Sequence, residues 1–188
     1  MLANNSMAQV QLQCHPARMS SGVSAVDVRI ALTEDGLLTA VYTLSGSLEG
    51  LWLPASAAPS RRDGLWQETC AELFIRKPEA DETYLEINFS PSSAWAAYQF
   101  DGYRSGMNVL DVAAPNIKTE LSNGVMEVTV VMTLPAAWQL SAMLVGASVV
   151  VSEEKDNMSY WAIAHPPGKP DFHHKDCFAL QLEARSAA

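Results

Sequence analysis

Basic residues are scarce in this chain of 188 residues. It carries 12 Lys and Arg against 21 Asp and Glu, which gives a formal net charge of −9. Nucleic acids and anionic membranes are bound by basic surfaces. The charge balance therefore predicts that neither nucleic acid nor a membrane is a partner of this protein.

Cysteine is rare as well, and long apolar runs are missing. Cys14, Cys70 and Cys177 are odd in number and form no Cys-x-x-Cys pair, which favours reduced thiols over a disulfide scaffold or a zinc site. No run approaches the roughly 18 apolar residues of a membrane span. Residues 1–13 also lack the basic start and apolar run of a signal peptide. These features predict a cytoplasmic protein.

Helical periodicity and catalytic motifs are nearly absent. The best helical candidate is 134–143, where Pro135 suits a first turn, so we expect one short helical turn. The sequence contains no GxSxG, HExxH, GxGxxG or Walker A pattern. Both observations favour a non-catalytic protein that is not of the α/β class.

Apolar and polar residues instead alternate with period two, which is typical of strands with one buried face. Asp35-Gly36 and Asn123-Gly124 add hairpin-turn signals. About ten strands follow, at 26–32, 37–44, 65–76, 83–90, 95–100, 117–121, 125–134, 144–153, 158–164 and 178–182. The pattern predicts an all-β fold, a two-sheet antiparallel β-sandwich. We expect a single domain over 10–184, with a flexible N-terminus at 1–9 and a tail at 185–188.

Residues at even positions of the segments 65–76 and 84–90 share one predicted face. The polar and aromatic ones are Trp66, Glu68, Glu72, Tyr84, Glu86 and Asn88. A sugar packs its C–H face on an aromatic ring and directs its hydroxyls to carboxylates and amides. The face therefore predicts a saccharide site. The alternative is a solvated sheet face whose Trp66 and Phe74 are covered by a loop.

Several other residues are secondary candidates for ligand binding, namely Trp95, Arg104, His165, His173 and His174. The three histidines lie in one stretch with two aspartates, which raises a metal site as a hypothesis, although no strict ligand spacing appears. A polar loop anchored by prolines is the alternative reading of this stretch. The carboxylates on the predicted sheet face leave glycosidase chemistry as an enzymatic alternative.

Three segments carry a family resemblance: LWQETCAELFI at 65–75, YLEINFSPSSAWAAYQFDGYRSGM at 84–107 and YWAIAHPPGKPDFHHKDCFALQL at 160–182. The sequence resembles bacterial DOMON-like proteins related to the family 9 carbohydrate-binding modules, over residues 10–184. The resemblance implies a jelly-roll-like β-sandwich of about ten strands. Its sugar-binding members clamp a terminal sugar between two tryptophans. This implies Trp66 opposite Trp161, with Glu68 and Asn88 reading the hydroxyls.

The main hypothesis is thus a non-catalytic module that binds a small ligand, a saccharide, without a cofactor. An interaction module that docks a protein partner is the second hypothesis. Haem-binding relatives use methionine or histidine ligands, which leaves haem open through a pair such as Met107 and His165.

Overall fold

The computed structural model describes residues 6–33, 36–78, 82–139, 142–154 and 157–183. The predicted tail at 185–188 and the first five residues of the predicted flexible N-terminus lie outside the described residues. The first strand begins at Ser6, before the expected start of the domain at residue 10.

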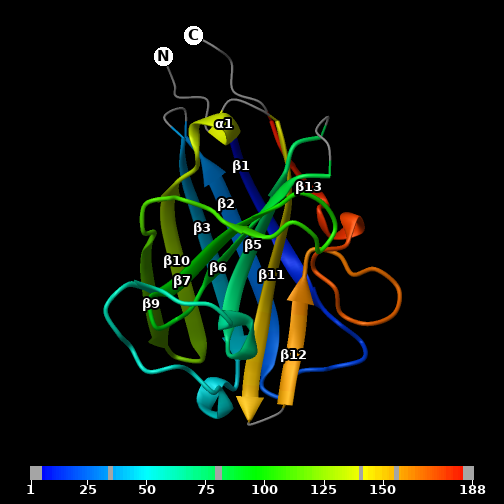
Figure 1. Cartoon of the computed structure of the whole chain (residues 1–188). Helices are drawn as coiled ribbons and strands as arrows, with labels where there is room; N and C mark the ends of the chain where they lie inside the picture. The colour runs from blue at the N-terminus through cyan, green and yellow to red at the C-terminus, as the bar shows by residue number, and fades with distance from the viewer. Residues whose placement is uncertain (1–5, 34–35, 79–81, 140–141, 155–156, 184–188) are drawn as a thin grey trace.

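Thirteen strands form one curled sheet (Figure 1). They are β1 (Ser6–Cys14), β2 (Val23–Leu32), β3 (Leu37–Gly46), β4 (Ser60–Arg61), β5 (Cys70–Arg76), β6 (Tyr84–Phe89), β7 (Ala94–Phe100), β8 (Asn108–Val109), β9 (Asn116–Ser122), β10 (Val125–Thr133), β11 (Met143–Glu154), β12 (Asn157–Ala162) and β13 (Leu180–Leu182). The order is β4-β7-β6-β5-β11-β12-β1-β2-β3-β10-β9, with β13 on β11 and β8 on β7. All pairs are antiparallel except β4 with β7.

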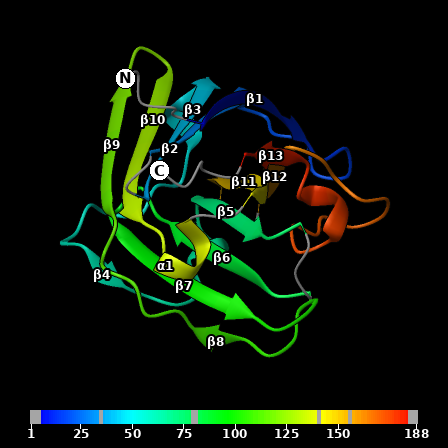
Figure 2. The ribbon, with the colours of Figure 1, turned by 90° about the horizontal axis from the view of Figure 1, so that it is seen from above.

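Strand β1 joins two halves of the sheet, β4-β7-β6-β5-β11-β12 on one side and β2-β3-β10-β9 on the other. Its residues 6–12 pair with β2, and Gln13 and Cys14 pair with β12. Seen from above, the sheet curls so that β3 and β10 form one wall of the interior and β5, β6 and β7 another (Figure 2). The all-β prediction is confirmed, but the two separate sheets are replaced by one continuous sheet, because β1 changes partners along its length.

The ten predicted strands all correspond to observed strands, and the structure adds β1, β4 and β8. The predicted helical turn is α1 (Ala136–Gln139), whose Trp138 is buried. Three short 3₁₀ helices lie in connections: η1 (Leu48–Gly50), η2 (Leu65–Gln67) and η3 (Lys175–Cys177). No helix in the described ranges has the length and apolar character that crossing a membrane requires.

The main core lies inside the curl and is built by strand alternation. On β5, Ala71, Leu73 and Ile75 point into it, and on β6 Leu85 and Ile87 do the same. Both walls contribute, since the buried positions of β2, β3 and β10 belong to the same apolar cluster. Branched side chains suit these positions because they pack well on a pleated surface.

The other side chains of β5, β6 and β7 point away from the main core, yet they are buried too. A second apolar cluster there includes Phe74, Tyr84, Tyr98 and Phe100. The residues that cover this face come from the connection between β12 and β13, where Phe172 and Phe178 join the cluster. We call this side of the sheet the pocket face. Strands β5, β6 and β7 are therefore buried on both of their faces.

Glu153, near the end of β11, holds the connection between β1 and β2. Its carboxylate accepts hydrogen bonds from Ser20 Oγ at 2.6 Å and from the backbone N–H groups of Ser21 at 2.9 Å and Val23 at 3.2 Å. The Gly22 N–H donates to the same carboxylate. Burial would raise the pKa of Glu153, but these hydrogen bonds lower it below its usual value.

Replacing Glu153 with alanine would remove the acceptor shared by these three N–H groups, of which that of Val23 is buried. We expect Glu153→Ala to lower the free energy of unfolding by about 2–4 kcal/mol. Urea unfolding followed by circular dichroism measures this difference. Glu120→Ala, on exposed β9, is the matched control and should change it by less than about 0.5 kcal/mol. Equal stability of the Glu153 variant and the wild type would contradict this role.

Candidate functional site

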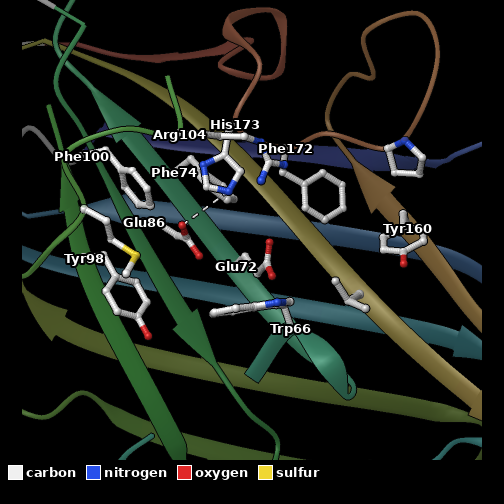
Figure 3. Close-up of a pocket in the computed structure, with 13 residues that line it drawn as sticks. Trp66, Glu72, Phe74, Glu86, Tyr98, Phe100, Arg104, Tyr160, Phe172 and His173 are labelled. Carbon is white, nitrogen blue, oxygen red and sulfur yellow. Dashed lines mark ion pairs between the residues drawn. The ribbon is translucent and has the colours of Figure 1, made fainter. Parts of the chain in front are cut away.

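A pocket of about 500 Å³ opens on the pocket face (Figure 3). Its floor comes from β5, β6, β7, β11 and β12, and its rim comes from η2 and from the connections that follow β7 and β12. The lining residues are Trp66, Glu72, Phe74, Glu86, Tyr98, Phe100, Arg104, Met107, Val150, Tyr160, Pro170, Phe172 and His173. The site is thus a concave, mainly aromatic cavity with a few polar groups, which is the usual form of a small-molecule site.

Sheet register sets the positions of the two carboxyl groups in the floor. Glu72 is paired with Ser148 on β11 and with Asn88 on β6. Glu86 is paired with Phe74 on one side and with Tyr98 on the other. Glu72 and Glu86 are therefore diagonal neighbours on adjacent strands. This relation places the Cα atoms of two residues about 7–8 Å apart.

Both carboxyl groups are buried and have few hydrogen-bond donors. Glu72 is 3% exposed and accepts one hydrogen bond, from Ser148 Oγ at 3.3 Å. Glu86 is 6% exposed and accepts from Asn88 Nδ2 at 2.8 Å. Burial, with the nearby charge of Glu86, raises the pKa of Glu72 from 4.5 to about 8, and burial raises the pKa of Glu86. Glu72, in the floor of the pocket, therefore retains its proton at neutral pH.

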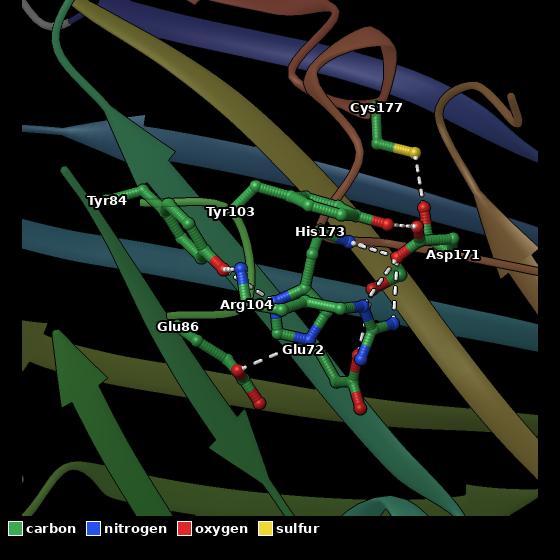
Figure 4. Close-up of polar contacts among 9 residues, drawn as sticks. Glu72, Tyr84, Glu86, Tyr103, Arg104, Asp171, His173 and Cys177 are labelled. Carbon is green, nitrogen blue, oxygen red and sulfur yellow. Dashed lines mark hydrogen bonds and ion pairs between the residues drawn. The ribbon is translucent and has the colours of Figure 1, made fainter. Parts of the chain in front are cut away.

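His173 lines one side of the pocket, and Tyr84 lies behind it, where the two side chains are hydrogen-bonded (Figure 4). The Tyr84 hydroxyl and His173 Nδ1 share a hydrogen bond of 2.7 Å, and the Arg104 N–H donates to the same hydroxyl at 3.3 Å. His173 Nε2 lies 3.7 Å from Glu86 Oε2. Burial, together with the charge of Arg104, lowers the pKa of His173 to about 4. His173 is consequently neutral at pH 7 and does not balance the charge of Glu86.

Arg104 is the cationic residue of the pocket lining, and its charge is already paired. Its Nη2 and Nε donate to Asp171 Oδ1 at 2.8 and 3.3 Å. The Tyr103 hydroxyl donates to the other oxygen of Asp171. Hydrogen bonds from Tyr103 and Arg104 outweigh the effect of burial and keep the pKa of Asp171 below its usual value. Arg104 and Asp171 therefore form a neutral pair at the rim.

Aromatic rings supply most of the walls. Phe74, Phe100 and Phe172 are buried, and the Phe74 ring centroid lies 5.1 Å from that of His173. Tyr98 is fixed by a 2.5 Å hydrogen bond from its hydroxyl to Asp63. Trp66 stands at the rim and is 43% exposed, so part of its ring can meet a ligand.

The structure brings five of the predicted site residues to this pocket: Trp66, Glu72, Glu86, Arg104 and His173. Tyr84 and Asn88 lie just behind, where they hydrogen-bond to His173 and Glu86. The predicted face is thus neither open nor simply solvated. It is a covered sheet face that encloses a cavity.

Trp161 does not lie opposite Trp66, which corrects the expected tryptophan clamp. Trp161 is 6% exposed and belongs to the main core, with its Nε1 donating to Ser159 Oγ at 3.2 Å. Its neighbour Tyr160 has the opposite strand parity and lines the pocket instead.

Glu68 and Trp95 are also placed away from the pocket. Glu68 directly follows η2, before β5 begins, and its Oε2 lies 2.8 Å from Arg62 Nη2. Trp95 belongs to the main core, and the guanidinium of the exposed Arg61 lies 4.1 Å from the centroid of its ring. Neither residue belongs to the pocket lining.

Of the three predicted histidines, His173 and His174 line a second pocket of about 320 Å³, and His165 does not. His165 Nε2 hydrogen-bonds to the Gln13 carbonyl, and its ring contacts that of His15. His174 Nδ1 lies 3.5 Å from Asp176 Oδ2. In the described part of the chain, no three His, Cys, Asp or Glu side chains are grouped to hold a metal ion. Met107 lines the larger pocket and His165 does not, and the haem alternative stays a prediction.

Four aromatic lining residues were not predicted: Tyr98, Phe100, Tyr160 and Phe172. Tyr98 and Phe100 occupy even positions on the strand next to the predicted hairpin, so parity could have found them. Tyr160 follows from parity on β12 in the same way. Phe172 lies outside the strands, where no periodicity signals its position.

Known proteins resemble this chain at the level of the fold. A "putative carbohydrate-binding protein" from Bacteroides uniformis superposes with a TM-score of 0.67 and 13% identity, covering 91% of this chain and 84% of that one. A family 9 carbohydrate-binding module from Caldicellulosiruptor kristjanssonii, in complex with cellotriose, gives a TM-score of 0.47 at 11% identity, covering 88% and 75%. No protein-family model and no curated protein matches the chain. The first likeness shows a shared fold, and membership of the DOMON-like group stays a prediction.

The raised pKa of Glu72 predicts a pH-dependent stability. Between pH 4.5 and about 8, the folded state holds a proton that the unfolded state has lost, so the free energy of unfolding falls as the pH rises. Glu72→Gln removes this ionisation. We expect the variant to gain on the order of 2 kcal/mol over the wild type between pH 5 and pH 8, measured by urea unfolding at each pH.

Glu68→Gln is the control for this experiment, since Glu68 is paired at the surface. It should follow the pH dependence of the wild type. Parallel pH profiles of the wild type and Glu72→Gln would contradict a protonated Glu72 in the folded state.

Proposed function

We propose that the pocket binds a small polyhydroxylated ligand, a saccharide, without chemical conversion. The observation that carries this proposal is the combination of aromatic walls with two buried carboxyl groups in a cavity of about 500 Å³. Pockets for small molecules typically measure about 300–1,000 Å³. The C–H faces of a sugar pack on aromatic rings, and its hydroxyls donate to carboxyl oxygens.

The lining residues divide these tasks. Trp66 is the stacking platform, because it stands at the rim with part of its ring exposed. Glu72 and Glu86 accept hydrogen bonds from ligand hydroxyls at the floor, and Arg104 contacts the ligand at the entrance. The description of the Bacteroides uniformis protein that shares this fold, a putative carbohydrate-binding protein, is consistent with this assignment.

Glycoside hydrolysis is the alternative that the same two carboxyl groups raise, and it stays an untested prediction. A glycosidase needs one carboxylic acid and one ionised carboxylate beside the scissile bond. Burial and the charge of Glu86 raise the pKa of Glu72 to about 8. Burial also raises the pKa of Glu86, but a hydrogen bond from Asn88 and the charge of Arg104 oppose this rise. The third carboxylate of the enzymatic hypothesis, Glu68, lies outside the pocket. Docking of a protein partner stays an untested prediction.

The stacking role of Trp66 predicts a fluorescence response. Titration with a panel of neutral mono- and oligosaccharides should quench or shift the tryptophan emission of the wild type for at least one member. Trp66→Ala should lose this response and weaken binding by about tenfold or more, because it removes the exposed ring at the rim.

Trp52→Ala is the matched control, since Trp52 is 60% exposed and does not line the pocket. This variant should keep the affinity of the wild type. A panel without any response, confirmed by calorimetry, would overturn the saccharide proposal.

A further inference from the structure

We propose that the ligand of this pocket carries a positively charged amino group, which lies between Glu72 and Glu86 against the aromatic walls. This inference rests on the proposed function and narrows its ligand class from saccharides in general to amino sugars. It follows from the charge balance of the pocket, from unused hydrogen-bond acceptors and from the rings around them.

When Glu72 and Glu86 are both ionised, the charge of the lining is negative and uncompensated. Glu72 and Glu86 are the acidic groups of the lining, and Arg104 is its cation. Asp171 already neutralises Arg104 through two hydrogen bonds, and the buried His173 is neutral. Buried charges in proteins are paired with an opposite charge or else lose their ionisation. A cationic ligand would supply the missing counter-charge.

The carboxyl groups also have acceptor capacity that the protein does not use. Glu72 Oε2 accepts from Ser148, whereas Glu72 Oε1 has no hydrogen-bond partner among the described residues. Figure 3 shows the Glu72 side chain pointing into the cavity although it is only 3% exposed. Diagonal neighbours have Cα atoms about 7–8 Å apart. This spacing leaves room for one ammonium group, which has three donors, to reach the carboxylates of both Glu72 and Glu86.

Aromatic rings surround the same volume. Phe74, Tyr98 and Phe100 extend from β5 and β7, and Tyr160 and Phe172 lie on the opposite side. A cation within about 6 Å of a ring centroid is attracted to the ring face, most strongly where water is excluded. A neutral hydroxyl group gains no such attraction. The walls therefore favour an ammonium group over the hydroxyl that it replaces.

The proposal predicts that binding of a permanently charged ligand becomes tighter as the pH rises toward 8. An ammonium group requires ionised carboxylates, and Glu72 must lose the proton that it holds up to about pH 8. The titratable groups that act electrostatically on Glu72 are Tyr42, Cys70, Glu86 and Arg104. Tyr98 and His173 line the same pocket, and Asp171 is paired with Arg104. Except for Glu86, the pKa values of these groups are displaced away from the range of pH 6–8.

Calorimetric titration at pH 7 with D-glucosamine, D-glucose and N-acetyl-D-glucosamine tests the inference. D-glucosamine should bind at least tenfold more tightly than either neutral sugar. Glu72→Gln and Glu86→Gln should each reduce this preference to less than threefold. Glu68→Gln should retain it, because Glu68 is paired with Arg62 outside the pocket. Circular dichroism checks that each variant is folded, and the comparison of ligands on the wild type is decisive even without the variants.

Comparing choline with its neutral isostere 3,3-dimethyl-1-butanol measures the effect of the positive charge on binding in the absence of a sugar ring. Choline carries a permanent charge, so its binding should tighten between pH 6 and pH 8 and exceed that of the isostere. Equal affinity for D-glucosamine and D-glucose would overturn the amino-group inference and leave saccharide binding intact. Preference for choline over its isostere, with no binding of any sugar, would support the charged group and overturn saccharide binding. No binding of any of the five compounds would overturn both.

Discussion

Two carboxyl groups are buried as diagonal neighbours in one pocket of this protein, and Arg104, the cation that the described residues place in its lining, is already paired with Asp171. Strand alternation imposes this arrangement, because the odd positions of β5 and β6 are committed to the main core. The even positions, which include Glu72 and Glu86, must then face the other side of the sheet. A shift of the register by one residue would send the acids into the main core and the leucines to the pocket.

This arrangement opposes stability. A buried carboxyl group with one hydrogen bond costs free energy, and each of the two disfavours the ionisation of the other. The chain nevertheless surrounds them with a shared set of supports: Asn88 and Ser148 donate to them, and Tyr84 positions His173 beside Glu86. Ionisable groups that destabilise the folded state and lie in a cavity are candidates for a functional role. This arrangement supports the proposal that the pocket binds a ligand.

The sequence was most informative where periodicity was strong. Alternation located ten of the strands and assigned Glu72 and Glu86 to one face. It could have located β1 as well, since Ala8, Val10 and Leu12 alternate with glutamines. Parity also argues for Tyr160 rather than Trp161 at the pocket, whereas the resemblance to sugar-binding modules suggested the tryptophan.

The cover of the pocket lay beyond prediction from the sequence. Asp171, Phe172 and His173 come from a connection without periodicity, and their positions depend on contacts with residues far away in the chain. Without that cover, the even face of β5 and β6 would be open to solvent and its carboxylates would be ordinary surface acids. Burial, and with it the unusual chemistry of the site, is a tertiary property.

The protonation of Glu72 in the ligand-free protein is the central claim, and carboxyl carbon NMR measures it directly. A pH titration of the ¹³C-labelled wild type, with Glu72→Gln used to assign the resonance, follows the side-chain carboxyl shift from pH 4 to pH 9. The structure predicts that Glu72 retains its proton at pH 7 and titrates near pH 8. A Glu72 carboxyl that is fully ionised by pH 6 would contradict the account of this pocket.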